Sequence, residues 1–120
     1  MPDVPFRISH DRAGDVAVLR VWGAVDHIQY HALEEAIQGE LDRRQLKLVV
    51  DLSELTYISS AGINVLGHAV AQYEKIQGRF RLVRPVKTAQ WHFFTTIGVD
   101  AIFPWSASLE EAVAAIRSDS

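Results

Sequence analysis

The sequence has no cysteine, no long hydrophobic run and no strong excess of positive or negative charge. The absence of cysteine excludes disulfide bonds, thiolate catalysis and cysteine-type zinc sites, and it agrees with a reducing compartment. No apolar run approaches the roughly 20 residues of a membrane-spanning helix. The first residues lack the basic and apolar segments of a signal peptide. We therefore expect a cytoplasmic protein that does not insert into membranes.

Positive charge is neither abundant nor clustered. Twelve Lys and Arg residues against fifteen Asp and Glu residues give a formal net charge of −3. The basic residues are scattered along the chain, whereas binding to a nucleic-acid backbone needs a basic face. We therefore expect no direct contact with nucleic acid.

What is present is the composition of a folded domain. The 120 residues are 48% apolar, which is enough to bury a core without help from disulfides or a metal. No internal repeat, low-complexity segment or linker divides the chain. We expect a single domain over residues 1–120, with its core over about residues 6–118.

The first half of the chain changes from strand to helix periodicity. Residues 6–10 and 16–22 indicate a hairpin around a polar turn that contains Gly14. Asp26 then precedes a helical pattern and is a suitable N-cap. Residues 46–52 form a nearly continuous apolar run, typical of a strand covered on both faces. The apolar face of this first helix is predicted to consist of Ile28, Ala32, Leu33, Ala36, Ile37 and Leu41.

The second half follows a polar break at residues 53–59 and alternates helices with short strands. In the short helix, Ala89, Phe93 and Ile97 form the predicted inward face. In the last helix, Ser108 and Glu111 have the spacing of a capping box. The predicted elements are a deeply packed helix from Ser60 to about Ile76, a strand at 78–84 ended by Pro85, a helix at 88–98 closed by Gly98, a strand at 101–103 and a helix that continues to 117.

Helices thus connect the strands that follow the hairpin. Right-handed crossovers of this kind make successive strands parallel, while a hairpin adds the first strand in the antiparallel direction. The predicted fold class is therefore α/β, with a mixed, mostly parallel sheet of about five strands, about four helices and the first strand antiparallel at an edge.

Two serines occupy the point where the central strand gives way to the second helix. Ser59 or Ser60 can be a simple N-cap, because a side-chain oxygen there accepts a hydrogen bond from a first-turn amide. The start of a helix also favours negative charge, so a hydroxyl at this point can be phosphorylated without breaking the helix. The residues leave both roles open, a structural cap and a phosphorylation switch.

The stretch VVDLSELTYISSAGINVL, residues 49–66, resembles the core signature of STAS domains, the family of the bacterial anti-sigma-factor antagonists. VWGAVD, residues 21–26, resembles the turn before their first helix. Residues 80–116 follow their tail of strand, Pro-x-Val, short helix ending in Gly, brief strand and last helix. The resemblance covers nearly the whole chain. It implies a STAS-type fold and a protein that acts by binding another protein, not by catalysis.

In such proteins, the resemblance implies, a serine kinase that is also the anti-sigma factor binds the unmodified antagonist and releases the sigma factor. Phosphorylation of the antagonist breaks this complex, and a phosphatase restores it. The family's phosphorylated serine corresponds to Ser60, two residues before Gly62, and Asp26 matches its acidic residue beside the serine. The expected partner-binding residues are Asp26, Ser59, Ser60, Ala61, Gly62, Ile63 and Trp91.

The chain departs from the family pattern at two positions. Ser59 stands where the family usually has Asp, and Ala61 stands where it often has a second Ser or Thr. Ser59 is therefore the alternative phosphoacceptor, or only the helix cap. The alternative function is a STAS module that is not phosphorylated and serves as a scaffold or regulatory binding module in a larger signalling assembly or transporter system.

Other candidate sites carry weaker signals. Trp91 falls opposite the predicted inward face of its helix, so it is either a partner anchor or a packed residue. His27 and His31 have the spacing of metal ligands, but the sequence offers no third ligand beyond Asp26, and we expect no metal. Ile58 stands where the nucleophile elbow of a hydrolase has Gly. With no Gly-rich nucleotide loop either, we expect neither an enzyme nor a cofactor.

Overall fold

Strands and helices alternate along residues 4–118, which are the residues that the computed structural model describes. Two strands open the chain as a hairpin, and each later strand follows a helix. In chain order the elements are β1 (Arg7–Ala13), β2 (Val16–Val25), α1 (Tyr30–Asp42), β3 (Lys47–Ile58), α2 (Ser60–Lys75), β4 (Arg79–Val83), α3 (Thr88–Thr96), β5 (Trp105–Ser106) and α4 (Leu109–Ser118).

The strands form one five-stranded sheet in the order β1-β2-β3-β4-β5. β1 pairs with β2 in the antiparallel direction, and every other neighbouring pair is parallel. A helix joins the two strands of each parallel pair, as the need for a crossover connection requires. The predicted mixed sheet, with its first strand antiparallel at an edge, is therefore confirmed.

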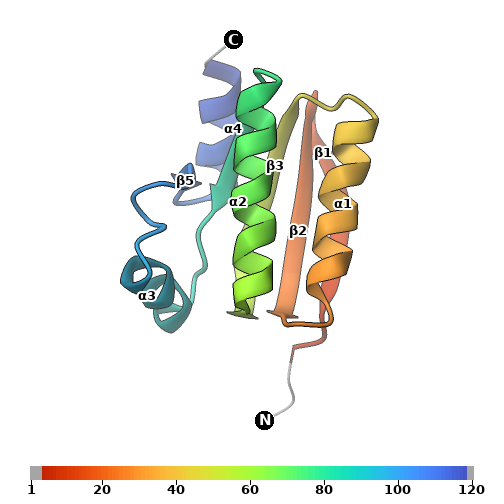
Figure 1. The fold of residues 1–120 in the computed structure, drawn as a ribbon. Coiled ribbons are helices and arrows are strands. Elements are labelled where there is room, and N and C mark those ends of the chain that lie inside the picture. Colours follow the sequence, from red (N-terminus) through yellow and green to blue (C-terminus); the bar gives the residue numbers. More distant parts are fainter. Residues whose placement is uncertain (1–3, 119–120) are drawn as a thin grey trace.

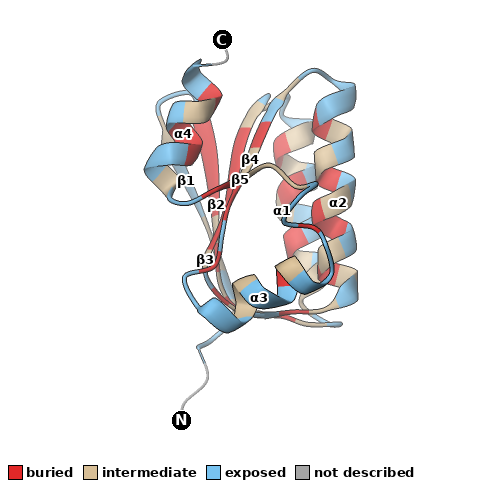
Figure 2. Ribbon diagram, turned by 90° about the vertical axis from the view of Figure 1, so that its left-hand side faces the viewer, coloured by how far each residue is buried: buried red, intermediate tan, exposed pale blue. Residues whose placement is uncertain are grey.

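The helices cover the two faces of the sheet unequally. Figure 2 shows α1 and α2 packed on one face, α4 on part of the opposite face, and α3 at the end of the sheet where α2 begins. The larger core cluster lies under α1 and α2, and a smaller one lies under α4. Because β2 and β3 are covered on both faces over much of their length, their side chains form nearly continuous buried apolar runs.

The central strand is longer than the sequence predicts. We expected a polar break at residues 53–59, but β3 continues to Ile58. Leu55 and Ile58 remain buried while Tyr57 is exposed. Two register shifts against β2, characteristic of β-bulges, break the simple alternation, so the pattern resembles a loop in the sequence. This extension carries the chain directly to the start of α2.

The strand predicted at residues 101–103 is wrong. The chain turns there, and the last strand is Trp105–Ser106. Trp105 lies opposite Leu82 and Ser106 lies opposite Val83 in the parallel pairing with β4. A two-residue strand has too little periodicity to be read from a sequence, and the apolar run before it drew the prediction to the wrong place.

The first helix begins later than predicted. The Asp26 carboxylate accepts hydrogen bonds from the amides of Ile28, at 2.9 Å, and Gln29, at 2.7 Å. Asp26 therefore caps the turn that leads into α1, and the Tyr30 amide donates to its backbone oxygen at 3.1 Å, but the regular helix begins only at Tyr30. Ile28 belongs to this turn and is 65% exposed, so its predicted place on the buried face of the helix is wrong.

The predicted inward face of α3 is also wrong. Phe93 and Ile97 are exposed, and so is Ala89, whereas Phe94 is fully buried. Phe94 packs against Trp91 and Trp105, at ring-centroid distances of 6.4 and 4.9 Å. In a helix of nine residues one buried aromatic ring decides the orientation, and the sequence does not show which of two adjacent Phe residues that is.

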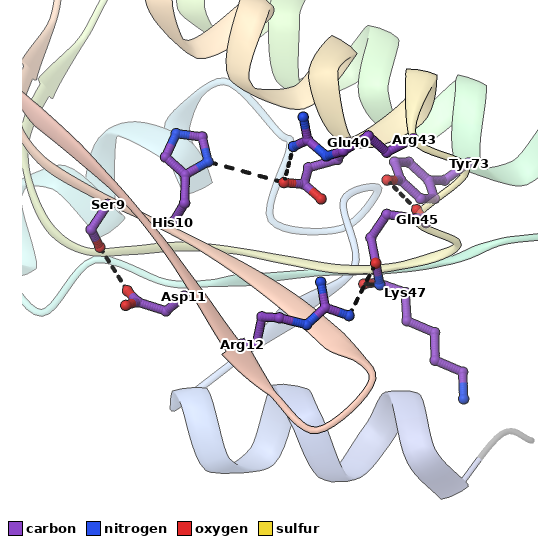
Figure 3. Close-up of polar contacts among 9 residues, drawn as sticks. All are labelled: Ser9, His10, Asp11, Arg12, Glu40, Arg43, Gln45, Lys47 and Tyr73. Carbon is purple, nitrogen blue, oxygen red and sulfur yellow. Dashed lines mark hydrogen bonds and ion pairs between the residues drawn. The ribbon is translucent and has the colours of Figure 1, made fainter.

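A buried carboxylate joins the edge strand to the helices at the end of the sheet opposite α3 (Figure 3). Glu40 of α1 accepts from the Arg43 guanidinium at 2.7 Å and lies 4.0 Å from the His10 imidazole of β1. Nearby, the Tyr73 hydroxyl of α2 donates to the backbone oxygen of Gln45 at 2.8 Å. Burial, and in smaller measure the Glu40 charge, raise the pKa of Tyr73 above its ordinary value.

Replacing Tyr73 by Phe tests this contact. The change removes the donor to the Gln45 oxygen, so we expect the free energy of unfolding to fall by about 1 kcal/mol. A raised pKa means that the native state resists ionisation, so wild-type stability is complete below about pH 10 and declines above it. Tyr73→Phe should lose most of that alkaline decline. Urea unfolding at a series of pH values from neutral to 11 would measure both effects. If the free energy of unfolding of Tyr73→Phe declined with pH as steeply as that of wild type, the assignment would be contradicted.

Candidate functional site

The start of α2 is held by Ser59. This residue has φ −81° and ψ 169°, and its Oγ accepts from the Gly62 amide at 3.3 Å. Its backbone oxygen accepts from the Ile63 amide at 3.0 Å. These are the features of a helix N-cap, so the predicted structural role of Ser59 is confirmed.

Ser60 is the first residue of α2 and is exposed. The amides of the first helical turn point towards the helix start, and the helix dipole places about half a positive charge there. Added negative charge on Ser60 would therefore meet a favourable local field. The hydroxyl stands at the surface and not inside the core, which is the condition that a phosphorylation site must meet.

Strand pairing brings Asp26 to the same end of the sheet. Val25 lies opposite Ile58 in the parallel register, and the Ser59 amide donates to the Val25 oxygen at 2.8 Å. Asp26 follows Val25, so the two turns lie side by side. Hydrogen bonds from the Gln29 and Ile28 amides lower the pKa of Asp26, which keeps its carboxylate ionised at neutral pH.

Gly62 is buried beneath this turn. A Cβ at this position would lie 2.6 Å from Cγ1 of Ile58 and 2.9 Å from Cγ1 of Val25. The missing side chain therefore lets α2 approach the ends of β2 and β3. Ile63 is half-buried and packs against the core, so of the predicted partner-binding residues in the turn Ser60 is the most open to solvent.

A groove runs from the turn between α1 and α2. It has a volume of about 430 Å³ and is open to solvent. Ala61 belongs to the groove and follows Ser60 directly, so the predicted site and the groove form one surface. The residues that line it are Tyr30, Glu34, Ala61, Asn64, Val65 and His68.

Trp91 packs against the protein. Its ring lies edge-on to that of Trp105, with centroids 5.0 Å apart and planes at 86°. The Arg84 guanidinium also lies over the Trp91 ring, 5.5 Å from its centroid. Trp91 is partly buried against the core, so the packing interpretation is confirmed. Because the residue is only partly buried, its contact with a partner stays a prediction.

The sequence analysis missed exposed apolar side chains at this end of the sheet. They lie on the segments that follow β2 and β4, at the end of β3, and on α3, which lies at the same end in Figures 1 and 2. Three of them, Ile28, Phe93 and Ile97, were assigned to buried helix faces, and nothing in the local pattern marks the other two. These residues are Ile28, Tyr57, Val86, Phe93 and Ile97.

Within residues 4–118, no helix is long and apolar enough to cross a membrane. The same residues contain no cluster of three His, Asp or Glu side chains that could hold a metal ion. His31 instead lies beside Tyr30, with ring centroids 4.0 Å apart, and 3.9 Å from the Glu34 carboxylate. The arrangement at the turn offers a surface for recognition.

Comparison with known proteins identifies the family to which this chain belongs. The family model described as Mlab, STAS domain matches residues 8–104. The chain is 29% identical over 113 residues to BtrV of Bordetella bronchiseptica, which is assigned to the anti-sigma factor antagonists; the match covers 94% of this chain and 97% of BtrV. It is 32% identical over 104 residues to RsfB of Mycobacterium tuberculosis, an anti-sigma-F factor antagonist, covering 85% and 82%. The chain therefore belongs to the STAS domain family.

Solved structures show the same fold. An anti-sigma factor antagonist from Mycobacterium paratuberculosis superposes with a TM-score of 0.83 at 27% identity, over 94% of this chain and 95% of that one. SpoIIAA in its unphosphorylated form gives 0.68 at 20% identity, over 94% and 98%, and its phosphorylated form gives 0.69 at 19%, over 94% and 100%. RsfB and SpoIIAA are both named as antagonists of anti-sigma factors, which is a regulatory role.

The different roles of the two serines can be separated by stability. Ser59→Ala removes the acceptor for the Gly62 amide, so we expect a loss of about 1 kcal/mol in the free energy of unfolding. Ser60→Ala changes an exposed side chain and should stay within about 0.5 kcal/mol of wild type. Chemical denaturation of the two variants side by side checks this. Equal losses would contradict the assignment of the cap.

Two glycines of α2 provide a second matched pair. Gly62→Ala forces a methyl group against Val25 and Ile58, and we expect a destabilisation of about 1–3 kcal/mol. Gly67→Ala places its methyl group 3.6 Å from the Phe103 ring, an ordinary contact, and should stabilise the helix by about 0.5–1 kcal/mol. Thermal unfolding would measure the opposite signs. A neutral Gly62→Ala would show that the turn has more room than the structure gives it.

Proposed function

We propose that the protein is an anti-sigma factor antagonist that binds an anti-sigma serine kinase through the Ser60 turn, and that phosphorylation of Ser60 switches this binding off. The observation that carries the proposal is the placement of Ser60. Its hydroxyl is exposed at the first residue of α2, beside a neighbouring serine that already caps the helix. The domain can therefore accept a charge there without losing its fold.

The switch is electrostatic. A phosphate adds about −1.5 to −2 charge at neutral pH, which the amino end of α2 tolerates. The Asp26 carboxylate stands on the adjoining turn and is kept ionised by its backbone hydrogen bonds. A partner that covers the turn already has to accommodate one negative charge, and a phosphate adds a second, larger one. Phosphorylation therefore disfavours the complex and leaves the free domain intact.

Exposed apolar side chains support a docking surface at this end. Ile28 is 65% exposed and Val86 is 74% exposed, on the loops that follow β2 and β4. Phe93 and Ile97 add apolar area on α3. Clustered exposed apolar residues are typical of protein interaction sites. The partner therefore presents an apolar surface to these residues and covers the charge-sensitive Ser60 turn. A phosphatase acts on the phosphorylated form.

The chain's own relatives agree with this role. RsfB is named an anti-sigma-F factor antagonist, and SpoIIAA has been solved with and without phosphate. Ser59 in place of the family's usual Asp favours the second candidate, a STAS module that binds without being phosphorylated. In that case the turn still docks a partner, as part of a larger signalling assembly or a transporter system, but carries no switch.

The binding test uses each serine-kinase anti-sigma factor that the source genome encodes, titrated calorimetrically against variants of the full chain. We expect Ser60→Ala to bind as tightly as wild type and Ser60→Asp to bind about tenfold or more weakly, because the partner would bury an uncompensated charge. Ser118→Asp makes the same change at the exposed end of α4, on the opposite face of the sheet, and serves as the matched control that should bind like wild type. Equal affinities for Ser60→Ala and Ser60→Asp would overturn the switch.

The modification test separates the two candidate functions. Incubation with the bound kinase and ATP should add the mass of one phosphate to wild type and to Ser59→Ala, but not to Ser60→Ala. Tandem mass spectrometry assigns the position. A kinase that binds tightly and leaves the mass unchanged favours the unphosphorylated STAS module, and a phosphate on Ser59 would show that the cap and not the exposed hydroxyl is the acceptor.

A further inference from the structure

The free edge of β1 is a second surface, independent of the Ser60 turn. β1 has β2 on one side, and the sheet order leaves its other side without a strand among residues 4–118 (Figure 1). The turn to β2 has two residues and begins at Gly14, with φ +65°, as in a type II′ hairpin. Such a hairpin fixes which backbone groups point outwards.

The residues that flank a two-residue hairpin turn form a hydrogen-bonded pair, so Ala13 directs its backbone N–H and C=O to Val16. Alternation then turns every second residue of β1 towards β2 and the others away from it. Arg7, Ser9 and Asp11 bond to β2 in this pattern. The outward backbone groups belong to Ile8, His10 and Arg12.

The side chains of β1 divide between the two faces of the sheet. Figure 3 shows His10 pointing towards Glu40 on the α1 side, while Ser9 and Asp11 form their own contact, at 2.7 Å, on the other side. Arg7 shares that other side and lies over the Trp22 ring, 4.4 Å from its centroid. One face of the edge thus carries opposite charges four residues apart.

A groove of mixed character lies on the α1 side of the same edge, where His10 and Glu35 join its apolar lining. It has a volume of about 400 Å³ and separates β1 from α1. Phe6 and Ile8 of the first segment, with Ala32 and Ala36 of α1, supply its apolar lining, and Phe6 and Ile8 are only partly buried against the core. The edge strand therefore offers both unpaired backbone groups and apolar area.

We propose that a second copy of this chain pairs with the free edge, antiparallel, about a twofold axis at Ser9, so that two sheets continue into one. In this register Ile8 forms a hydrogen-bonded pair with the partner's His10. Arg7 lies opposite the partner's Asp11, in a pair whose Cα atoms are about 4.5 Å apart. The symmetry makes each contact twice, as an isologous interface requires.

Charge selects this register from its neighbours. A twofold axis at His10 would place Arg7 opposite the partner's Ala13, so the ion pairs between Arg7 and the partner's Asp11 would be lost. An axis at Asp11 sets two carboxylates against each other, which disfavours it. Edges that avoid pairing commonly carry charges that repel another strand. β1 instead carries Arg7 and Asp11 at positions that meet in a twofold arrangement, and its other Arg, Arg12, falls opposite the partner's Phe6. The two grooves become continuous on the α1 face.

Sedimentation equilibrium of the full chain over a wide concentration range tests the pairing. Wild type should show a reversible monomer–dimer equilibrium. Arg7→Asp and Asp11→Arg should each weaken the dimer about tenfold, because each sets like charges opposite one another on both sides of the axis. The double variant Arg7→Asp with Asp11→Arg should restore the dissociation constant to within about threefold of wild type.

A backbone variant tests the strand pairing itself. His10→Pro removes an outward N–H and leaves the ladder to β2 in place, because proline is tolerated on an edge. His10→Ala is the matched control, since it loses the same contact with Glu40 but keeps the N–H. We expect His10→Ala to dimerise and His10→Pro to stay monomeric, with both folded by circular dichroism. In wild type, amide exchange at Ile8 and His10 should slow as concentration rises.

Three results would overturn the proposal. The chain could remain monomeric at every concentration. It could dimerise with the same constant in His10→Pro and in the charge variants, which would place the interface elsewhere. It could also leave the edge free for an extended peptide of another protein and never pair with itself. None of these outcomes depends on Ser60, and a failed phosphorylation test leaves the dimer prediction unchanged.

Discussion

The parallel pairing of β2 with β3 at their carboxyl ends is the constraint on which the rest of the site depends. It sets Val25 opposite Ile58, and the Ser59 amide bonds to the Val25 oxygen just beyond the last pair. That bond fixes the two following turns against each other. Gly62 completes the arrangement, because only a residue without a side chain lets α2 start against Val25 and Ile58. The Asp26 carboxylate, the Ser59 cap and the exposed Ser60 hydroxyl are thereby brought to one end of the sheet.

The helix that presents Ser60 also carries Tyr73, which lies at its other end. Thirteen residues of helix separate them, a rise of about 20 Å, well beyond the screening length of about 8 Å at physiological salt. The buried Glu40 and the Tyr73 hydroxyl bond belong to that far end. A change of charge at Ser60 is therefore electrostatically separate from the polar contacts that hold α1, α2 and β1 together. The recognition surface can be altered while the frame stays the same.

Periodicity in the sequence was enough to predict the fold class, the order of elements and the antiparallel edge strand, because long amphipathic helices and apolar strands carry strong local patterns. It failed where tertiary contacts decide. The bulges in β3 disguised the last half of that strand, and a single aromatic contact turned α3 so that Phe94 and not Phe93 is buried. At the site, the sequence placed two serines at a helix start. It could not assign their separate roles, since a cap depends on backbone angles that both residues could adopt.

The capping bond of Ser59 has a chemical consequence. Its oxygen already accepts from the Gly62 amide and the residue is half-buried, so esterifying it would disturb the hydrogen bond that caps the helix. The capping bond therefore acts as a protecting group does in synthesis, and of two adjacent, chemically identical alcohols it leaves one open to an incoming electrophile. If the proposed kinase acts on this turn, its selectivity between the neighbouring serines is built into the substrate and need not be supplied by the enzyme.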